Sequence, residues 1–161
     1  MTWGIPTDTF VQIHVIISLI ALVAGCLVLY GLFIGTASSA WTVLFLATTI
    51  LTSVTGFPLP PFGFDPARAL GVILLVLVAL AVAALYAYHL AGAWRWIYVG
   101  STVAAFYLNV FVAVVQAFQK LSFLQPLAAA QSVVQVVVLA AFTALGVLAI
   151  IKFHPEAKAT T

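Results

Sequence analysis

Hydrophobic residues occur along the chain in five long runs, separated by short polar or proline-rich segments. The runs cover residues 11–34, 41–57, 69–90, 96–118 and 127–151. A bilayer hydrocarbon core about 30 Å thick needs about 20 residues of helix to cross it, and each run comes close to that length. The pattern therefore predicts an all-α membrane protein in which five transmembrane helices form one antiparallel bundle.

The segments between the runs are too short to hold a soluble domain. The longest, FPLPPFGFDPAR at 57–68, is rich in turn-forming residues. The prolines at 58, 60, 61, 66 and 126 all lie in such connections, where breaking a helix is harmless. We therefore expect a single transmembrane domain over 1–161 that ends in a short polar tail at 153–161.

Composition agrees with this prediction, because 66% of the residues are hydrophobic and only 5% are charged. The first ten residues contain no Lys or Arg, so the first run lacks the basic flank of a cleaved signal peptide. The lone Cys26 excludes a disulfide framework and a cysteine metal site. A net charge of +2 is too small and too scattered to indicate nucleic acid as a partner. The expected environment is a lipid bilayer.

The basic residues predict an orientation. We call the end of the bundle that holds the N-terminus side A and the opposite end side B. Side A carries Arg68 and Lys120, whereas side B carries Arg95, Lys152 and Lys158. The positive-inside rule then places side B in the cytoplasm and the N-terminus outside. Because the margin is three against two, insertion in both orientations as an antiparallel dimer is an alternative. An aromatic belt is expected at the side-B interface, formed by Trp41, Trp94, Trp96 and Tyr98.

Polar residues inside the runs recur at helical spacing, which places them on single faces. These stripes are Thr102, Ala105, Asn109, Gln116 and Lys120 in the fourth run; His14, Ser18, Ala21 and Gly25 in the first; Thr48, Thr52 and Thr55 in the second; and Gln131 and Gln135 in the fifth. Because the chain alternates direction, most of the large polar side chains fall in the side-A half of the bilayer. The third run is apolar throughout from 71 to 85, so we expect it at the periphery or in a subunit contact.

Two interpretations of these stripes are open. Small and hydroxyl-bearing residues ordinarily hold membrane helices together, and His14 can also anchor at the interface. Several large polar side chains in one leaflet are more than a helix seam needs, however, and they favour a partly hydrated pocket open to side A. The candidate ligand-binding residues are His14, Thr52, Asn109, Gln116, Gln131 and Gln135.

Asp65 and Arg68 stand three residues apart at the expected start of the third helix. With Pro66 next in the chain, Asp65 resembles a helix N-cap, and Arg68 would form a local ion pair with it. The alternative is that Arg68 overhangs the side-A pocket and attracts an anionic group.

Several chemistries are disfavoured by what the runs lack. No run contains a carboxylate, which argues against a transporter coupled to protons or sodium through Asp or Glu. His14 is the only histidine in the side-A half, so two histidines cannot clasp a haem there. No set of three or four metal ligands is visible, and a hydrolytic triad lacks an acidic member.

The stretches TSVTGF (52–57), HLAGAWRWIYV (89–99) and YLNVFVAVVQAFQKL (107–121) resemble a family of small bacterial multi-pass membrane proteins that has no assigned activity. The resemblance covers most of residues 10–150 and implies a bacterial cytoplasmic membrane. Asn109, Gln116 and Gln131 match the family pattern. Members carry a histidine where Arg68 stands and a Pro- and Glu-containing stretch in place of AQSVVQV (130–136), so any acid or base work of those positions is absent here.

The leading hypothesis is a non-enzymatic bundle that binds or passes a small, largely uncharged molecule through the side-A pocket. One alternative is a redox subunit that holds a quinone or a haem. Another is a structural accessory subunit that docks on a larger membrane complex or forms a homo-oligomer.

Overall fold

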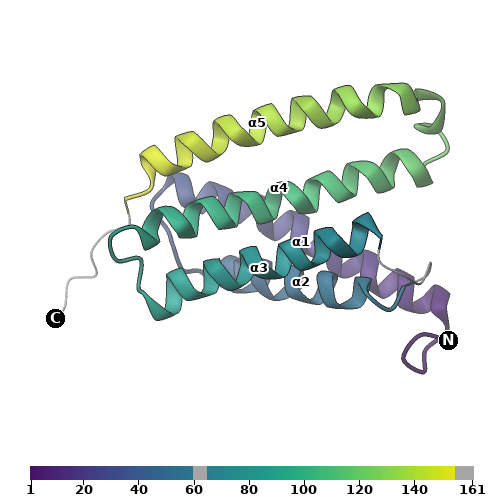
Figure 1. Cartoon of the computed structure of the whole chain (residues 1–161), viewed down its shortest axis with the longest axis horizontal. Helices are drawn as coiled ribbons and strands as arrows, with labels where there is room; N and C mark the ends of the chain where they lie inside the picture. The colour runs from purple at the N-terminus through teal and green to yellow at the C-terminus, as the bar shows by residue number, and fades with distance from the viewer. Residues whose placement is uncertain (60–64, 155–161) are drawn as a thin grey trace.

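In the computed structural model, which describes residues 1–59 and 65–154, all the regular elements are helices. Five long helices run alternately up and down the bundle, as Figure 1 shows. They are α1 (Thr7–Phe33), α2 (Ala40–Gly56), α3 (Pro66–Val82), α4 (Trp94–Lys120) and α5 (Gln131–Lys152). A π-helical turn at Ala83–Ala87 continues α3, and a 3-10 helix at Gln125–Ala130 leads into α5. The predicted all-α bundle is therefore confirmed.

Four of the helical segments are long and apolar enough to cross a membrane, which makes this a multi-pass membrane protein. The fifth, α2, has 17 residues. At 1.5 Å per residue it spans about 26 Å, which is less than the usual hydrocarbon core. Parts of the sequence prediction lie outside the described residues: the prolines at 60 and 61, Lys158 and most of the polar tail.

Two helices begin at side-chain caps that the sequence encodes. Ser39 Oγ accepts a hydrogen bond from the backbone N–H of Thr42 at the start of α2, at 3.2 Å. Asp65 Oδ1 accepts one from the backbone N–H of Arg68 at the start of α3, at 2.9 Å, and Pro66 takes the first helical position. Each cap satisfies a backbone donor that has no partner within the helix. The predicted N-cap at Asp65 is confirmed.

The helices pack as a series of neighbours, with α4 as the element that joins them. Helix α1 packs on α2, α2 on α3 and α3 on α4, while α4 also contacts α1 and α5. The closest approach is at Gly25 of α1, where an added Cβ atom would overlap the ring of Phe106 on α4. Phe106 in turn packs edge-on against Phe45 of α2 and Phe142 of α5. This aromatic cluster ties four helices together near the middle of the bundle.

The peripheral helix is α5, which corrects the expectation that the third run would be peripheral. Of the spanning windows, that of α5 is 6% buried and that of α3 is 33% buried. Ala149 is the one fully buried residue among those of α5. Figure 1 shows α5 along one edge of the molecule, beside α4. A purely apolar sequence can pack inside a membrane bundle or face lipid, because the two surroundings are equally apolar.

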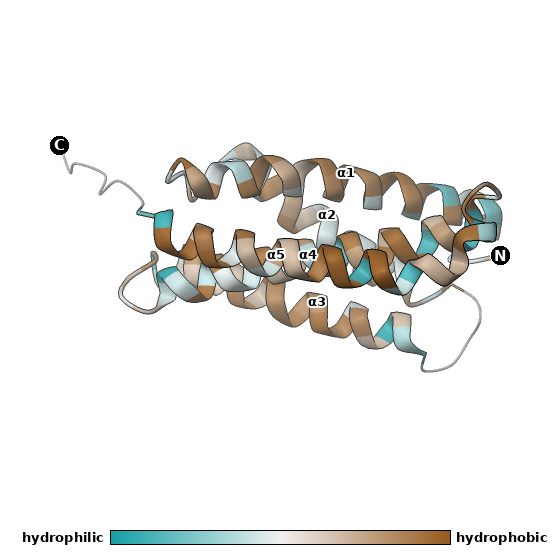
Figure 2. Cartoon of the chain, turned by 90° about the horizontal axis from the view of Figure 1, so that it is seen from above, coloured by the Kyte–Doolittle hydropathy of each residue, from teal (hydrophilic) through white to brown (hydrophobic). Residues whose placement is uncertain are grey.

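The outer surface is apolar along the length of the bundle. In Figure 2 hydrophobic residues colour most of the helices, and hydrophilic residues gather mainly at the two ends. Large exposed side chains come from every helix, including Leu19, Val43, Val76 and Val137. A protein in water rarely shows so much apolar surface, so lipid is the solvent that suits it.

Of the predicted aromatic belt at side B, the three tryptophans lie at that end of the bundle, and Tyr98 does not belong to the belt. Trp41 and Trp96 are exposed, and Trp94 is half-buried and stacked on Tyr88. Tyr98 is fully buried, and its hydroxyl donates a 2.6 Å hydrogen bond to the carbonyl oxygen of Ala37. It therefore holds the α1–α2 connection against α4 and does not face the headgroups.

Candidate functional site

The polar contact between α1 and α2 centres on His14. Its Nδ1 lies 2.8 Å from Thr55 Oγ1, and the Thr55 hydroxyl donates its proton to the carbonyl oxygen of Leu51 at 2.6 Å. Thr55 Oγ1 must therefore accept from His14, so Nδ1 carries a hydrogen. In the neutral imidazole, Nε2 is then an acceptor. No hydrogen bond joins Nε2 to another residue in the described part of the chain.

Two further hydroxyls extend this contact toward the middle of the membrane. Ser18 Oγ donates to the backbone carbonyl oxygen of His14 at 2.8 Å, and it lies 3.4 Å from Thr52 Oγ1. Thr52 and His14, both predicted site residues, are thus brought together on the α1–α2 seam. Hydrogen bonds of this kind fix the rotation of one helix against the other.

Asn109 belongs to a different contact, between α4 and α2. Its Nδ2 donates to Thr49 Oγ1 at 3.1 Å, and both residues are buried. This pair satisfies two polar groups near mid-membrane and needs no bound molecule. The sequence placed Asn109 on an inward stripe, which is confirmed, but it did not single out Thr49 as the partner. The available signal was that Thr49 follows Thr48, a member of the hydroxyl stripe, at the matching depth.

Gln135 joins α5 to α4, because its Nε2 donates to the carbonyl oxygen of Phe111 at 3.0 Å. A carbonyl accepts only from the amide nitrogen, so this bond fixes which end of the amide is the oxygen. Gln135 Oε1 is buried and has no hydrogen-bond partner. One turn toward side A, Gln131 lies half-buried at about the depth of Gln116.

Gln116 has a buried Oε1 atom without a hydrogen-bond partner. It lies seven residues after Asn109, which is close to two helical turns, so the two share a face of α4. That face is turned by about 140° from Phe111, where Gln135 binds. The structure therefore separates the predicted site residues into an inward group with His14 and Gln116 and an outer contact at Gln135.

Lys120 ends the inward stripe of α4 at side A. It lies near enough to His14 for its charge to act on the imidazole. His14 on α1 and Gln116 and Lys120 on α4 thus lie at the same, side-A end of the bundle. Lys120 is exposed, whereas His14 and Gln116 are half-buried.

An apolar groove lies between α1 and α4. It has a volume of about 390 Å³ and is lined by Leu22, Cys26, Phe106, Val110, Ala113, Val114 and Ala117. The groove runs from Phe106 near mid-membrane to Ala117, which is next to Gln116 in the chain. The small side chains of Ala113 and Ala117 leave this space. His14, Gln116 and Lys120 are not part of its lining.

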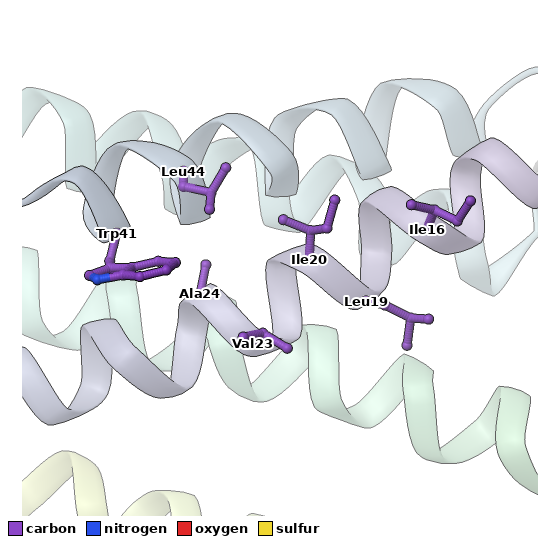
Figure 3. A pocket seen from close by; sticks show the side chains of 7 residues that line it. All are labelled: Ile16, Leu19, Ile20, Val23, Ala24, Trp41 and Leu44. Carbon is purple, nitrogen blue, oxygen red and sulfur yellow. The ribbon is translucent and has the colours of Figure 1, made fainter.

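A second groove, of about 300 Å³, lies between α1 and α2. Figure 3 shows Trp41 and Leu44 of α2 and five apolar side chains of α1 along it. None of the predicted site residues lines this groove, and its wall carries no charged side chain. It resembles the remainder of the lipid-facing surface.

Arg68 is engaged by its own chain. Its guanidinium donates to Asp65 Oδ2 at 2.8 Å, to the carbonyl oxygen of Leu59 at 2.7 Å and twice to that of Phe57, at 3.1 and 3.2 Å. The side chain is 11% exposed. The predicted ion pair is confirmed, and Arg68 also closes the end of α2 onto the start of α3. Attraction of an anionic group by Arg68 stays a prediction.

No group of three or more His, Cys, Asp or Glu residues able to hold a metal ion occurs among residues 1–59 and 65–154. His14 could ligate a haem iron through Nε2 as a single axial ligand. Its hydrogen-bonded Nδ1 is typical of a histidine oriented for ligation.

No family model, curated protein or solved structure matches the chain. The resemblance to small bacterial multi-pass membrane proteins therefore stays an expectation. What the structure establishes for the chain is a helical, multi-pass membrane protein.

Proposed function

We propose that this protein binds a small, largely uncharged, amphipathic molecule in the side-A half of its bundle, and that it is not an enzyme. The observation that carries the proposal is the buried Oε1 of Gln116, an acceptor without a donor among the described residues, at the depth of Ala117 in the apolar groove. Leaving such an atom unpaired costs about 1–3 kcal/mol. A bound molecule that donates a hydrogen bond would remove that cost.

The chemistry of the nearby groups defines the polar end of the ligand. Gln116 Oε1 accepts, and His14 Nε2 accepts in the neutral form, so the ligand should present hydroxyl or N–H donors. A cation would be repelled by Lys120. An uncharged alcohol, phenol or amide therefore suits this end best.

The groove defines the rest of the ligand. Its lining between α1 and α4 is apolar, and it leads toward mid-membrane. A molecule with a hydrocarbon tail could lie in it while its polar end reaches Gln116. A quinol meets both requirements, whereas an oxidised quinone offers only acceptors. This distinction brings the redox alternative within the same proposal, with the quinol as the bound form.

We place the protein in a bacterial cytoplasmic membrane with the N-terminus outside, so that the site opens to the outer leaflet. The support is the count of basic residues at the two ends together with the family resemblance. Passage of the ligand across the membrane would need a second opening toward side B. The seam is closed in that direction by the contact of Phe106 with Gly25.

The test uses protein purified in mild detergent, with bound small molecules extracted and identified by mass spectrometry. We expect the wild type to retain one amphipathic donor and Gln116→Leu to retain about tenfold less, the equivalent of about 1.4 kcal/mol. Gln119→Leu is the matched control, because Gln119 is exposed and lies off the stripe. A visible absorption spectrum checks the single-histidine haem alternative.

The following result would contradict the proposed function. If Gln116→Leu raises the stability of the protein and leaves its bound molecules unchanged, Gln116 is an unpaired packing residue and the proposal fails. The structural-subunit alternative would then gain support from other membrane proteins that co-purify in reproducible stoichiometry.

A further inference from the structure

A second polar feature lies at the opposite end of the bundle, where Arg95 occupies the first turn of α4. Its Nε atom is buried and has no hydrogen-bond partner within residues 1–59 and 65–154. Its guanidinium carbon lies 4.0 Å from the centre of the Trp96 ring. The cation is thus held against an aromatic face while at least one of its donors has no acceptor. This feature is independent of the side-A site and of the function proposed for it.

An unpaired arginine at such a position calls for an anion. The guanidinium stays charged at any physiological pH, so it cannot avoid the cost of burial by losing a proton. The planar group offers parallel donors that match a phosphate or a carboxylate. The contact with the Trp96 ring stabilises the charge. It does not satisfy the N–H donors, which point outward in the plane of the guanidinium.

The surroundings contain cations and aromatic rings. Because α5 runs antiparallel to α4, Lys152 in its last turn reaches the same end as Arg95. The acids in the described part of the chain, Asp8 and Asp65, both belong to side A. Glu156 is the remaining acid of the sequence and lies outside the described residues. The start of α4 favours an anion further through the helix dipole.

The aromatic side chains indicate the depth of this feature in the membrane. Trp94 stacks on Tyr88 with their ring centres 3.7 Å apart, and Trp96 and Tyr86 are exposed at the same end of the bundle. Tryptophan and tyrosine concentrate at the level of the lipid headgroups. These rings indicate that Arg95 lies at the end of the bundle where the headgroups are expected, next to apolar helix surface.

We infer that Arg95, held against Trp96 at the side-B end, binds the phosphate of an anionic phospholipid. Lys152 contributes a second, more exposed charge to the same headgroup. A lipid is favoured over free phosphate because the aromatic belt places the site at the headgroup level and the apolar flank suits an acyl chain.

The experiment reconstitutes the full chain in bilayers of equal parts phosphatidylcholine and phosphatidylglycerol, and measures which lipids stay bound after extraction into detergent. We expect phosphatidylglycerol to be enriched on the wild type. In Arg95→Gln the enrichment should fall by about fivefold, which corresponds to about 1 kcal/mol for one basic residue at an anionic surface. Lys152→Gln, the matched control, should fall by less because Lys152 is exposed and has no fork of donors.

Three other results of the lipid-enrichment experiment would overturn the inference. Equal enrichment in wild type and Arg95→Gln overturns the inference, as does full displacement of the lipid by inorganic phosphate, which would mean a free-anion site. Enrichment that appears only in Glu156→Gln also overturns it, since the chain's own tail would then occupy Arg95. If Arg95→Gln does not fold, Arg95→Lys decides: reduced enrichment supports recognition by the guanidinium, and unchanged enrichment contradicts it.

Discussion

Arg68 and Arg95 lie at opposite ends of the bundle, each in the first turn of a helix. Arg68 meets a carboxylate and two backbone carbonyl oxygens of its own chain. Arg95 meets an aromatic ring and has a buried donor without an acceptor. The comparison shows that the same residue type at a similar helical position serves the fold at one end. At the other end it is left available to something outside the chain.

The difference arises from the residues that precede each helix. Before α3 stands Asp65, which supplies both the N-cap and the ion pair, and the end of α2 supplies carbonyl oxygens. Before α4 stands AGA at 91–93, which offers no side-chain acceptor. An arginine thus stabilises the fold where the local sequence provides hydrogen-bond acceptors, and it is a candidate binding group where the local sequence provides none.

The largest effect on stability should come from removing the hydrogen bonds and the ion pair of Arg68. In Arg68→Gln, loss of the ion pair and of the bonds to the α2–α3 connection should lower the free energy of unfolding by about 2–4 kcal/mol. Arg95→Gln is the matched variant, and in neutral lipid it should change stability by no more than about 0.5 kcal/mol. Denaturant unfolding of both variants in the same detergent measures the difference. Equal losses would erase the distinction between the two ends.

A second test concerns the packing of α1 against α4 between the two ends of the bundle. Gly25→Ala would press a methyl group into the Phe106 ring and should destabilise the bundle by about 1–3 kcal/mol. Gly100→Ala is its control, because no atom lies within 4 Å of the Cβ position there, and it should be neutral or stabilising by up to about 1 kcal/mol. Thermal unfolding midpoints compare the pair. A neutral Gly25→Ala would mean that α1 and α4 can move apart at this point.

The smallest of these effects should come from the mid-membrane hydrogen bond. Replacing Asn109 and Thr49 by alanine, singly and together, should give a coupling energy of about 0.6–1.7 kcal/mol, the range found for such bonds between membrane helices. A coupling near zero would mean that each residue finds another partner when its own is lost. The result also calibrates how much a paired amide contributes, against which the unpaired Gln116 can be judged.

Much of the fold could be predicted because apolar length alone dictates a spanning helix. The caps could also be predicted, since Asp65 followed by Pro66 is a local signal. The position of Tyr98 could not, because its partner, Ala37, is 61 residues away in the chain. An aromatic residue near a helix end can face lipid or protein, and its own sequence neighbours do not distinguish the two.

The sequence also could not predict which helix is the most exposed. From 71 to 85 the third run has no polar residue, whereas the fifth run contains two glutamines, yet α3 is the better covered of the two helices. Gln135 explains this, because a single bond to the Phe111 carbonyl satisfies its amide nitrogen while α5 stays peripheral. Helical phase placed the candidate site residues on inward or outward faces, but only the structure shows that Gln135 of α5 contacts α4 on a different face from the one that carries Gln116.

The short helix α2 has a consequence for the membrane itself. At about 26 Å it does not match a hydrocarbon core of about 30 Å, whereas its neighbours do. The carbonyl oxygens that follow it, at Phe57 and Leu59, would then meet acyl chains if Arg68 did not bind them. We expect this hydrophobic mismatch to thin the bilayer beside α2, so that the protein should partition into thinner membranes and lose stability as lipid chain length increases.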